Sequence, residues 1–481
     1  MISQHDNGQE WQLYSLTVLG GVLLGAAFPP GPTGVLAWFS MAPIFYAALH
    51  ARSDRHAFWM VLAGFVVANS LAFPWPWRHP ILGLAVAGSS VWLLLAMIPA
   101  AVLAWARRVD DGMGRPAAIV ACVSGFLAAE AALTHTPLAI PWALLGHTQA
   151  ETEVLWGAAA YIGVEGLSAL LLIWSALLVA ILDVRSIRTK TVLALGLALS
   201  MMIPLLIPVP STPEGGEGLE ASIAIVQPGL GPLEWANDDR LRRGTLESLS
   251  ADLAMPNELI ALVWPEAATR ESDTWAGQPL IAGLIESGPP ANSIALNGRS
   301  VYQKRRLVPF IEAVPGELSV PWLGRLRLDP NGYRPGTGSP RINLGGHSIG
   351  LAICFETLFA AHFTELEGTR LNIAVTQDGW WQSRRAAWQH LVFSRFRALE
   401  TGTPLAVASV NGFSAVIRPD GHFQWQSRWD EASAEVVSVP ANRPPTYRRD
   451  WVAVPAVTIF LVLAFIIFRR NRRSSTRPKS H

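Results

Sequence analysis

Long apolar runs dominate the first 209 residues, and they constrain the possible folds more than any other feature of the sequence. A helix needs roughly 20 mostly apolar residues to cross the hydrocarbon core of a bilayer, which is about 30 Å thick. Eight runs of this kind occur, although the first two are short by this standard. They cover residues 14–28, 35–49, 57–73, 81–106, 117–133, 159–182, 191–209 and 451–468. The chain is therefore predicted to be a multi-pass membrane protein with about eight transmembrane helices.

Basic residues follow every second apolar run, and this pattern predicts the orientation of the helices. The basic segments contain Arg52 and Arg55; Arg107, Arg108 and Arg115; Arg185, Arg188 and Lys190; and Arg469, Arg470, Arg472 and Arg473. The intervening short loops contain only Arg78 as a strong positive charge. Short loops rich in Lys and Arg stay on the cytoplasmic side. We therefore expect both termini to be cytoplasmic and the region after the seventh helix to lie outside.

The composition changes between about residues 218 and 449, where charged, polar and short apolar segments are mixed. Short β-rich runs at residues 221–226, 259–263, 349–353, 371–375 and 405–410 accompany helix-like stretches at residues 239–253 and 386–400. Strands that alternate with helices predict an α/β domain. The expected organisation is a membrane domain with an exit linker (residues 1–218, linker 211–218), a catalytic domain (219–445), and a last transmembrane helix with a basic tail (446–481).

The sequence GLAICFE at residues 350–356 places Cys354 at the end of an apolar run. A residue at the carboxyl end of a buried strand lies at the sheet edge where open α/β sheets bind their ligands. The chain has one other cysteine, Cys122, and it lies inside an apolar run, so a structural disulfide is not expected. We interpret Cys354 as a candidate nucleophile, and the alternative is a buried structural cysteine. A nucleophilic thiol needs a base and a cationic neighbour.

Two segments upstream of Cys354 supply candidates for these partners. Glu266 comes just past the apolar run LIALVW, with Pro265 before it, and is a candidate base. Lys304 lies in the segment SVYQKRRLVPFIE, which leads to Glu312. A lysine ammonium can stabilise a thiolate or a developing oxyanion, while a carboxylate carries the proton. Each residue taken alone has an equally simple structural explanation, as a strand-end carboxylate or a solvated lysine.

The order of Glu266, Lys304 and Cys354, and the local sequences WPE, YQKRRLVPF and ICFE, resemble the carbon-nitrogen hydrolase (nitrilase) superfamily. More narrowly, the chain resembles the apolipoprotein N-acyltransferase family of the bacterial inner membrane. The likeness extends over seven helices, an external nitrilase-like domain and one closing helix. It includes residues 27–30 and 226–235, IPWALLGHTQ at 140–149, GVEG at 163–166, and WQHLVFSRFRALE at 388–400.

This resemblance implies the fold and the roles of the main site residues. It implies an αββα sandwich for the external domain, with Glu266 as general base, Lys304 as stabiliser of the oxyanion and thiolate, and Cys354 as nucleophile. It also implies a two-step reaction. Cys354 would attack the sn-1 ester of a phospholipid to form a thioester, and the N-terminal amine of a diacylglyceryl-cysteine apolipoprotein would then accept the acyl chain.

The resemblance further implies roles for residues around these three. Glu312 would support the base, Glu356 would order the site, and Trp235 would lie on a loop near the lipid entrance. Phe355 occupies a position where the family usually has Tyr. Ile311 stands where the family usually has Gly, and Gln377 where it usually has Asn. These departures, and a short interval between residues 266 and 304, leave the substrate open but do not change the reaction type that the resemblance implies.

The expected partners are a membrane phospholipid as acyl donor and a diacylglyceryl apolipoprotein as acceptor. No soluble cofactor and no metal are expected, and the protein is expected to be a monomer. The formal net charge of +1 gives no argument for nucleic acid as a partner. The resemblance places the protein in the bacterial inner membrane, with its catalytic domain on the periplasmic side.

Two other functions remain open. The chain could be a divergent membrane-bound amidase of the same superfamily that acts on another acyl substrate. It could also be a receptor or transporter whose external domain binds a ligand without chemistry. Glu130 and Glu165 fall within apolar runs, where a carboxylate is costly and usually faces protein or a water-filled cavity. They mark either a lipid path or a packing hydrogen bond.

Overall fold

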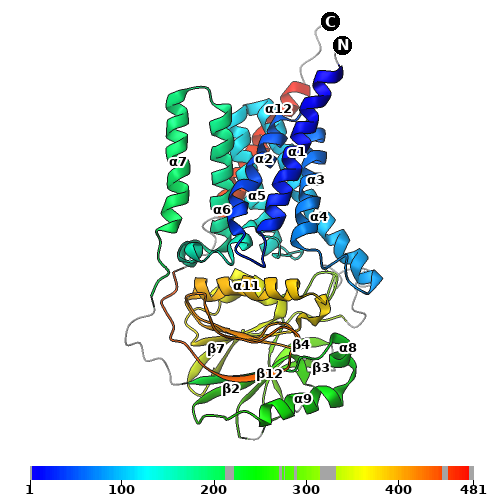
Figure 1. The fold of residues 1–481 in the computed structure, drawn as a ribbon, viewed down its shortest axis with the longest axis vertical. Helices are drawn as coiled ribbons and strands as arrows, with labels where there is room; N and C mark the ends of the chain where they lie inside the picture. The colour runs from blue at the N-terminus through cyan, green and yellow to red at the C-terminus, as the bar shows by residue number, and fades with distance from the viewer. Residues whose placement is uncertain are drawn as a thin grey trace.

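The computed structural model describes residues 3–211, 221–269, 274–275, 277–286, 290–314, 332–446 and 453–475. Over these residues, a bundle of helices is followed by two β-sheets with flanking helices, and a last helix returns to the bundle (Figure 1). The predicted combination of a multi-helix membrane region and an α/β domain is confirmed. Of the predicted linker only Ser211 is described, and the side chains of the basic residues after residue 468 also lie outside the description.

Each of the eight predicted apolar runs coincides with a helix of the bundle. These helices are α1 (Ser3–Ala27), α2 (Ala37–His50), α3 (Asp54–Ala72), α4 (Leu82–Met113), α5 (Arg115–His135), α6 (Trp156–Asp183), α7 (Ile187–Leu205) and α12 (Ala453–Ser475). Within the described residues, five helical segments are long and apolar enough to cross a membrane: α3, α4, α5, α7, and α6 with the turn before it. The number of eight spans therefore stays a prediction.

The end of the bundle nearest the sheets is built from loops and short 3-10 helices. These are η1 (Gly34–Leu36), η2 (Leu145–Gln149) and η3 (Glu153–Leu155). Within this layer, the Glu130 carboxylate from the end of α5 accepts a hydrogen bond from the Leu145 N–H at 2.6 Å, and Ser168 of α6 accepts one from the Gly146 N–H at 2.8 Å. Buried backbone donors need such partners. Glu130 thus has the structural role of holding η2, which was one of its two predicted roles.

Twelve strands in the described residues form two mixed sheets of six strands each. The first sheet runs β12 (Ser433–Ser438), β1 (Ser222–Gln227), β2 (Leu259–Thr269), β3 (Leu280–Glu286), β4 (Ala291–Leu296), β5 (Arg299–Gln303). The second runs β11 (Phe423–Gln426), β10 (Ala415–Ile417), β9 (Leu405–Ser409), β8 (Leu371–Thr376), β7 (His347–Ile353), β6 (Arg341–Leu344). In each sheet three neighbouring strands are parallel, β1–β2–β3 and β7–β8–β9, and their partners on either side are antiparallel.

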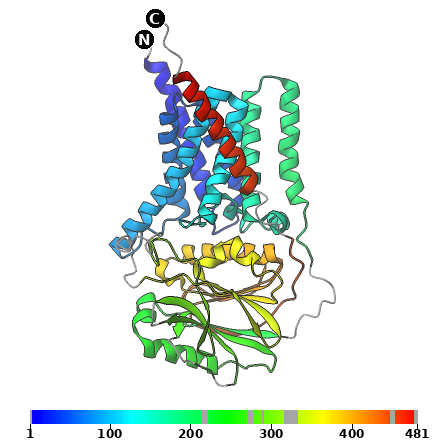
Figure 2. The same cartoon turned by 180° about the vertical axis from the view of Figure 1, so that it is seen from behind.

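The two sheets pack face to face and are covered by helices on their outer faces. Apolar side chains from both sheets, including Ile225, Val263, Ile353 and Val375, form one buried cluster between them. The helices α8 (Pro232–Asn237) and α9 (Asp239–Ala251) cover the first sheet, and α10 (Ala360–Thr364) and α11 (Arg384–Thr401) cover the second (Figures 1 and 2). The predicted αββα sandwich is therefore confirmed.

Helix α11 lies between the second sheet and the lower end of the bundle (Figure 1). Its residues Val392, Phe393 and Phe396 join the apolar core of the bundle. Leu391 and Ala398 pack in a separate apolar cluster between α11 and the second sheet. Because both sides of the helix are covered, its polar side chains must find partners in the adjoining loops. They bind loop carbonyl groups of the bundle: Gln389 donates to Pro29 and Ala72, and Arg395 donates to Ala150.

Candidate active site

Cys354 follows directly after β7 and begins the 3-10 helix η5 (Cys354–Leu358). The thiol is therefore at the carboxyl end of a parallel strand, as predicted from the apolar run before it. The backbone of Cys354 has a φ of +48°, in the left-handed region that costs an ordinary L-residue free energy. The residue is partly exposed. Desolvation by the surrounding protein and the nearby Glu266 charge raise the pKa of Cys354 well above its usual value, while Lys304 opposes this shift.

Lys304 follows β5, and its side chain is buried to 1% exposure. Its Nζ lies 2.8 Å from Oε1 of Glu312 and 3.8 Å from Oε1 of Glu266. Burial disfavours the ammonium, but the carboxylates of Glu312 and Glu266 outweigh burial and raise the pKa of Lys304 above its usual value. Lys304 is thus a fixed positive charge between two carboxylates. The structure places Lys304 near Glu266, Glu312 and Cys354, and the catalytic roles expected for these residues stay predictions.

Glu266 lies within β2, which extends to Thr269, so the prediction that it comes just past the strand was wrong. The strand is nevertheless irregular at this point, because its pairing with β3 shifts between Trp264 and Thr269 and Ala267 has a φ of +57°. Gly283 of β3 makes this bulge possible, since a Cβ there would lie 2.4 Å from the Glu266 Cα. Residues 266–269, which follow the apolar run, therefore belong to a bulged part of β2 and not to a loop.

The two carboxylate oxygens of Glu266 differ in their surroundings. Oε1 accepts a hydrogen bond of 2.6 Å from Nδ2 of Asn292 on β4, whereas Oε2 is buried without a hydrogen-bond partner among the described residues. Burial raises the pKa of Glu266, Lys304 lowers it, and Glu312 raises it further. A raised pKa suits a carboxylate that takes up and returns a proton near neutral pH. Oε2 is the oxygen available for that exchange.

Glu356 connects the turn at the nucleophile to the segment after β5. Its Oε1 accepts hydrogen bonds from the Tyr302 hydroxyl at 2.7 Å and from the Arg305 N–H at 2.8 Å, while Oε2 accepts from the Ile353 N–H at 2.9 Å. These bonds fix the residue before Cys354 relative to the residue after Lys304. Phe355 is buried and packs edge-to-face against Phe359.

Trp235 lies in the short helix α8 and is buried, so the predicted position on a loop was wrong. Its indole Nε1–H donates to the backbone carbonyl of Glu266 at 3.1 Å. Trp235 therefore packs behind the base and holds the bulge of β2. Glu312 also holds the site backbone, because its Oε2 accepts a hydrogen bond from the Val308 N–H at 2.7 Å.

Sequence reasoning missed three residues that contact this site. Asn292 and its neighbour Ser293 are the polar residues of an otherwise apolar strand, which is a weak signal that Asn292 has a buried partner. Nδ1 of His390 is hydrogen bonded to Oδ1 of Asp378 at 2.7 Å, and Nε2 of His390 lies 3.2 Å from the carbonyl oxygen of Cys354. His390 stands next to Gln389 in a helix that was predicted, but no spacing rule connects it to Cys354. Across the described segments, no group of three His, Cys, Asp or Glu side chains is arranged to hold a metal.

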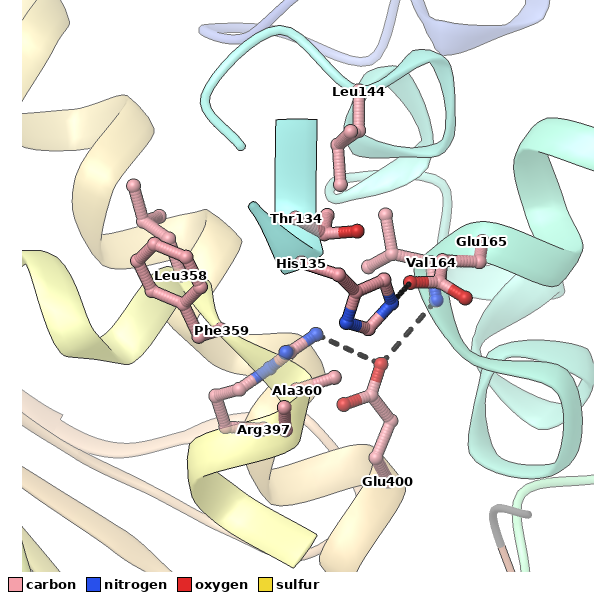
Figure 3. Close-up of a pocket in the computed structure, with 11 residues that line it drawn as sticks. Thr134, His135, Leu144, Val164, Glu165, Leu358, Phe359, Ala360, Arg397 and Glu400 are labelled. Carbon is pink, nitrogen blue, oxygen red and sulfur yellow. Dashed lines mark hydrogen bonds and ion pairs between the residues drawn. The ribbon is translucent and has the colours of Figure 1, made fainter. Parts of the chain in front are cut away.

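A cavity lined by both apolar and charged side chains lies where α6 meets α11, and none of Glu266, Lys304 or Cys354 lines it. Figure 3 shows Arg397 and Glu400 of α11 beside Val164 and Glu165 of α6. Glu400 Oε1 accepts from Arg397 at 2.8 Å and from the Val164 N–H at 3.3 Å, next to the break in α6 at Gly163. Burial raises the pKa of Glu400 to about 7, and Arg397 opposes this shift.

Oε1 of Glu165 lies 3.5 Å from Nε2 of His135, and both residues line this cavity. Glu165 therefore faces protein at the end of the bundle nearest the sheets rather than lipid, in agreement with the cost of a charge in hydrocarbon. The lipid path that we considered for Glu165 stays a prediction.

Two family models match separate parts of the chain. Residues 20–177 match the apolipoprotein N-acyltransferase N-terminal domain, and residues 282–444 match the carbon-nitrogen hydrolase. The first match covers most of the helical bundle. The second includes Lys304 and Cys354 and begins in β3, after Glu266. The fold and the motifs of the site thus agree with the family matches.

Curated relatives align with most of the chain. The apolipoprotein N-acyltransferase of Geobacter metallireducens is 28% identical over 85% of this chain and 86% of its own. That of Brucella suis is 29% identical over 83% of this chain and 81% of its own. A solved CN-hydrolase superfamily protein from Xanthomonas campestris aligns with 51% of this chain and 96% of its own, at 17% identity and a TM-score of 0.33. The chain is thus similar over most of its length to apolipoprotein N-acyltransferases, and its helical bundle and its sheets match the N-terminal domain of that family and the carbon-nitrogen hydrolase, respectively.

Proposed function

We propose that this protein is a membrane acyltransferase that moves a fatty acyl chain from a phospholipid to the N-terminal amine of a diacylglyceryl-cysteine protein. The observation that carries the proposal is the cluster of Cys354, Glu266 and Lys304 at one end of the two sheets, with both charged groups buried. The names of the relatives support an acyltransferase with a lipoprotein substrate. The phospholipid donor and the thioester are parts of the proposal.

In the first half-reaction, Glu266 Oε2 takes the proton of the Cys354 thiol, and the thiolate attacks the ester carbonyl of the phospholipid. The carbonyl oxygen becomes negatively charged, and the Lys304 ammonium stabilises it. The Phe355 N–H is a second available donor, because it makes no hydrogen bond within the described residues. When the intermediate collapses, the bond to the lysophospholipid oxygen breaks, and that oxygen takes the proton from Glu266. The acyl chain remains on Cys354 as a thioester.

In the second half-reaction, the amine of the acceptor attacks the thioester carbonyl. Glu266 removes a proton from the amine nitrogen, the bond between carbon and sulfur breaks, and an amide forms. The thiolate of Cys354 then recovers the proton from Glu266. Since a single nucleophile serves both substrates, the acyl donor must leave before the acceptor reacts, and ping-pong kinetics are expected.

The position of the site supports substrates that are confined to a bilayer. The second sheet faces one end of the bundle across α11, and this helix packs against both (Figure 2). A lipid donor and a lipid-anchored acceptor are both held near the membrane surface, so a site fixed there meets each of them at a high effective concentration.

The first test is to incubate the purified protein in detergent with phospholipid alone and to measure its intact mass. We expect one acyl adduct, located on Cys354 by peptide mapping and removed by hydroxylamine, which cleaves thioesters. Cys354→Ser should carry no adduct while keeping the thermal unfolding temperature of the parent, and Glu266→Gln should carry no adduct while remaining folded at the assay temperature. An active protein without an adduct on Cys354 would refute the thioester.

The second test adds a synthetic diacylglyceryl-cysteine peptide to the acylated protein. The adduct should disappear at the rate at which the N-acylated peptide forms. If the adduct is instead lost to water at the same rate with and without peptide, the protein is a hydrolase and the proposed acceptor is wrong.

A further inference from the structure

His390 and Asp378 form a buried hydrogen-bonded pair next to the backbone of the nucleophile Cys354. Asp378 begins the 3-10 helix η6 (Asp378–Trp381) after β8, and His390 lies in α11. Their side chains meet at 2.7 Å, between Oδ1 of Asp378 and Nδ1 of His390, and each is 4% exposed. With the Nδ1–H donating to Asp378, the other ring nitrogen, Nε2, faces the turn that starts at Cys354. It lies 3.2 Å from the Cys354 carbonyl oxygen and 3.0 Å from the Thr357 hydroxyl.

The carbonyl group that His390 faces belongs to a residue in a costly conformation. Cys354 has a φ of +48°, and such a conformation persists only when its surroundings hold it. The Thr357 hydroxyl donates to the same carbonyl at 3.1 Å. Two side chains, one in η5 and one in α11, thus converge on the Cys354 carbonyl oxygen.

The orientation of this carbonyl also fixes the donor on the other side of the peptide bond. A peptide unit is planar, and in a trans unit the C=O and the following N–H point in opposite directions. The bond between Cys354 and Phe355 is trans, because within the described residues only the peptide bond between Pro29 and Pro30 is cis. Holding the Cys354 oxygen toward His390 therefore turns the Phe355 N–H away from His390, toward the side where an oxyanion at the thiol would form.

We propose that His390, held by Asp378, is a positioning residue for the acylation step: its Nε2–H donates to the Cys354 carbonyl and so fixes the Phe355 N–H as the backbone oxyanion donor. The inference rests on the proposed function of Cys354. It assigns no contact between His390 and the substrate. The buried carboxylate of Asp378 compensates a ring that donates from both nitrogens.

Asp378 and His390 are themselves rigidly held. The second oxygen of Asp378 accepts hydrogen bonds from Ser409 at 2.9 Å and from Thr376 at 3.1 Å. The ring of His390 also stacks on the ring of Trp142, with 5.6 Å between ring centroids and 23° between ring planes. Trp142 belongs to the loop that follows α5, so the bundle contributes one wall to the environment of the nucleophile. The pair connects the membrane domain with the turn at Cys354.

Two substitutions at residue 390 separate this role from a purely structural one. The amide nitrogen of Gln takes the place of Nε2 and can still donate to the Cys354 carbonyl. The amide of Asn takes the place of Nδ1, so it keeps the contact with Asp378 but does not reach Cys354. We expect His390→Asn to slow single-turnover acylation by about a hundredfold with little change in KM, and His390→Gln to slow it by about tenfold or less.

A second measurement on the same variants is the rate at which iodoacetamide alkylates Cys354. Alkylation requires the thiolate but no oxyanion donor, so it should change by less than about threefold in both variants. If Gln is as slow as Asn in acylation, or slower, the carbonyl contact is not the function of His390. If acylation and alkylation fall in parallel, the pair acts on the thiol itself, and the inference is also overturned.

A control variant distinguishes the loss of the proposed contact from a general effect of replacing a buried histidine. His362→Gln alters another buried histidine that contacts a carbonyl of β7, that of Leu351 at 2.8 Å, and should leave acylation within about threefold. If the variants at residue 390 do not insert, Asp378→Asn tests the same inference, because an amide at this position can still accept from Nδ1–H but no longer compensates a ring that donates from both nitrogens. Acylation by Asp378→Asn at the parent rate would contradict the inference. A parent protein that is never acylated would instead refute the proposed function, which is a distinct outcome.

Discussion

Lys304 is an ammonium with 1% exposure, and its place between two carboxylates determines the charge balance of the site. A buried ion is tolerated when it is paired and hydrogen bonded, and removing one partner leaves an uncompensated charge that is strongly destabilising. The 2.8 Å contact with Glu312 is the closer of the two ion pairs. Glu312 therefore keeps Lys304 charged while Glu266 remains free to exchange a proton.

Glu312→Gln should move the acid limb of the pH–rate profile to lower pH. The Glu312 charge is one of the causes that raise the pKa of Glu266, so its removal makes Glu266 a weaker base that is deprotonated at lower pH. Because a weaker base accepts the thiol proton less readily, kcat should also fall, by roughly tenfold to a hundredfold. The measurement is kcat/KM for acylation from about pH 4 to 9. An acid limb that stays in place or moves upward would contradict this account of Glu312.

At the same scale, Glu266 and Cys354 were predicted from the apolar runs before them and Lys304 from a short strand-like segment, in an order that resembles a known superfamily. The sequence did not predict Asn292 or His390. Asn292 contacts Glu266 only because β3 and β4 pair antiparallel, and His390 reaches Cys354 only because α11 lies across the end of β7. Contacts that depend on the packing of separate elements leave no local pattern in the sequence.

Among the elements, α11 has the least ordinary environment, since it is covered on both faces and carries several buried charged groups. Arg397 and Glu400 are each 2% exposed, and Glu400 also accepts a hydrogen bond from the Val164 N–H at the break in α6. The ionisation of Glu400 is thus coupled to the packing of the membrane domain against the catalytic domain.

Glu400→Gln should flatten the pH dependence of stability between about pH 4.5 and 7. The pKa of Glu400 is raised from 4.5 to about 7 in the folded protein, so the folded state binds the proton more tightly than the unfolded state does. The parent protein should therefore lose stability as the pH rises through this range, by at most about 3 kcal/mol. Thermal unfolding in detergent at several pH values measures the effect. If the parent gains stability relative to Glu400→Gln as the pH rises over this range, the predicted sign of the Glu400 contribution is wrong.

The central strands and the two long helices of the catalytic domain were predictable because their apolar runs are long and regular. Strands β1, β7, β8 and β9 lie within one or two residues of the expected runs, as does α11. Strand β2 was predicted to end at Val263, but it continues to Thr269 through a bulge that β3 stabilises. The outer strands, such as β6 and β11, are short and partly exposed, so burial imposes little pattern on them.

For the whole molecule, the arrangement of the bundle supports the predicted orientation. The connection between α6 and α7 lies at the end of the bundle away from the sheets (Figure 1), and it contains Arg185, with Arg188 and Lys190 following in the first turn of α7. Because short basic loops are usually retained in the cytoplasm, we predict that the catalytic domain faces the other side of the membrane.

Cysteine labelling in spheroplasts tests this topology. In a Cys122→Ala, Cys354→Ala background, Glu431→Cys places a thiol on an exposed loop of the catalytic domain, and Ser186→Cys places one in the loop between α6 and α7. A membrane-impermeant maleimide should label position 431 in intact spheroplasts and position 186 only after lysis. The reverse pattern would place the sheets in the cytosol and exclude a periplasmic site.

The location of α11 also has a consequence for biosynthesis. The loop carbonyls of Pro29, Ala72 and Ala150 are hydrogen bonded by α11, yet roughly 200 residues separate the end of α6 from the start of this helix. At a ribosomal rate of ~5–20 residues per second, the first helices wait about 10–40 s for their last layer. During this interval the nascent chain presents unpaired backbone groups at the bilayer surface, where an insertase or chaperone would have to shield them.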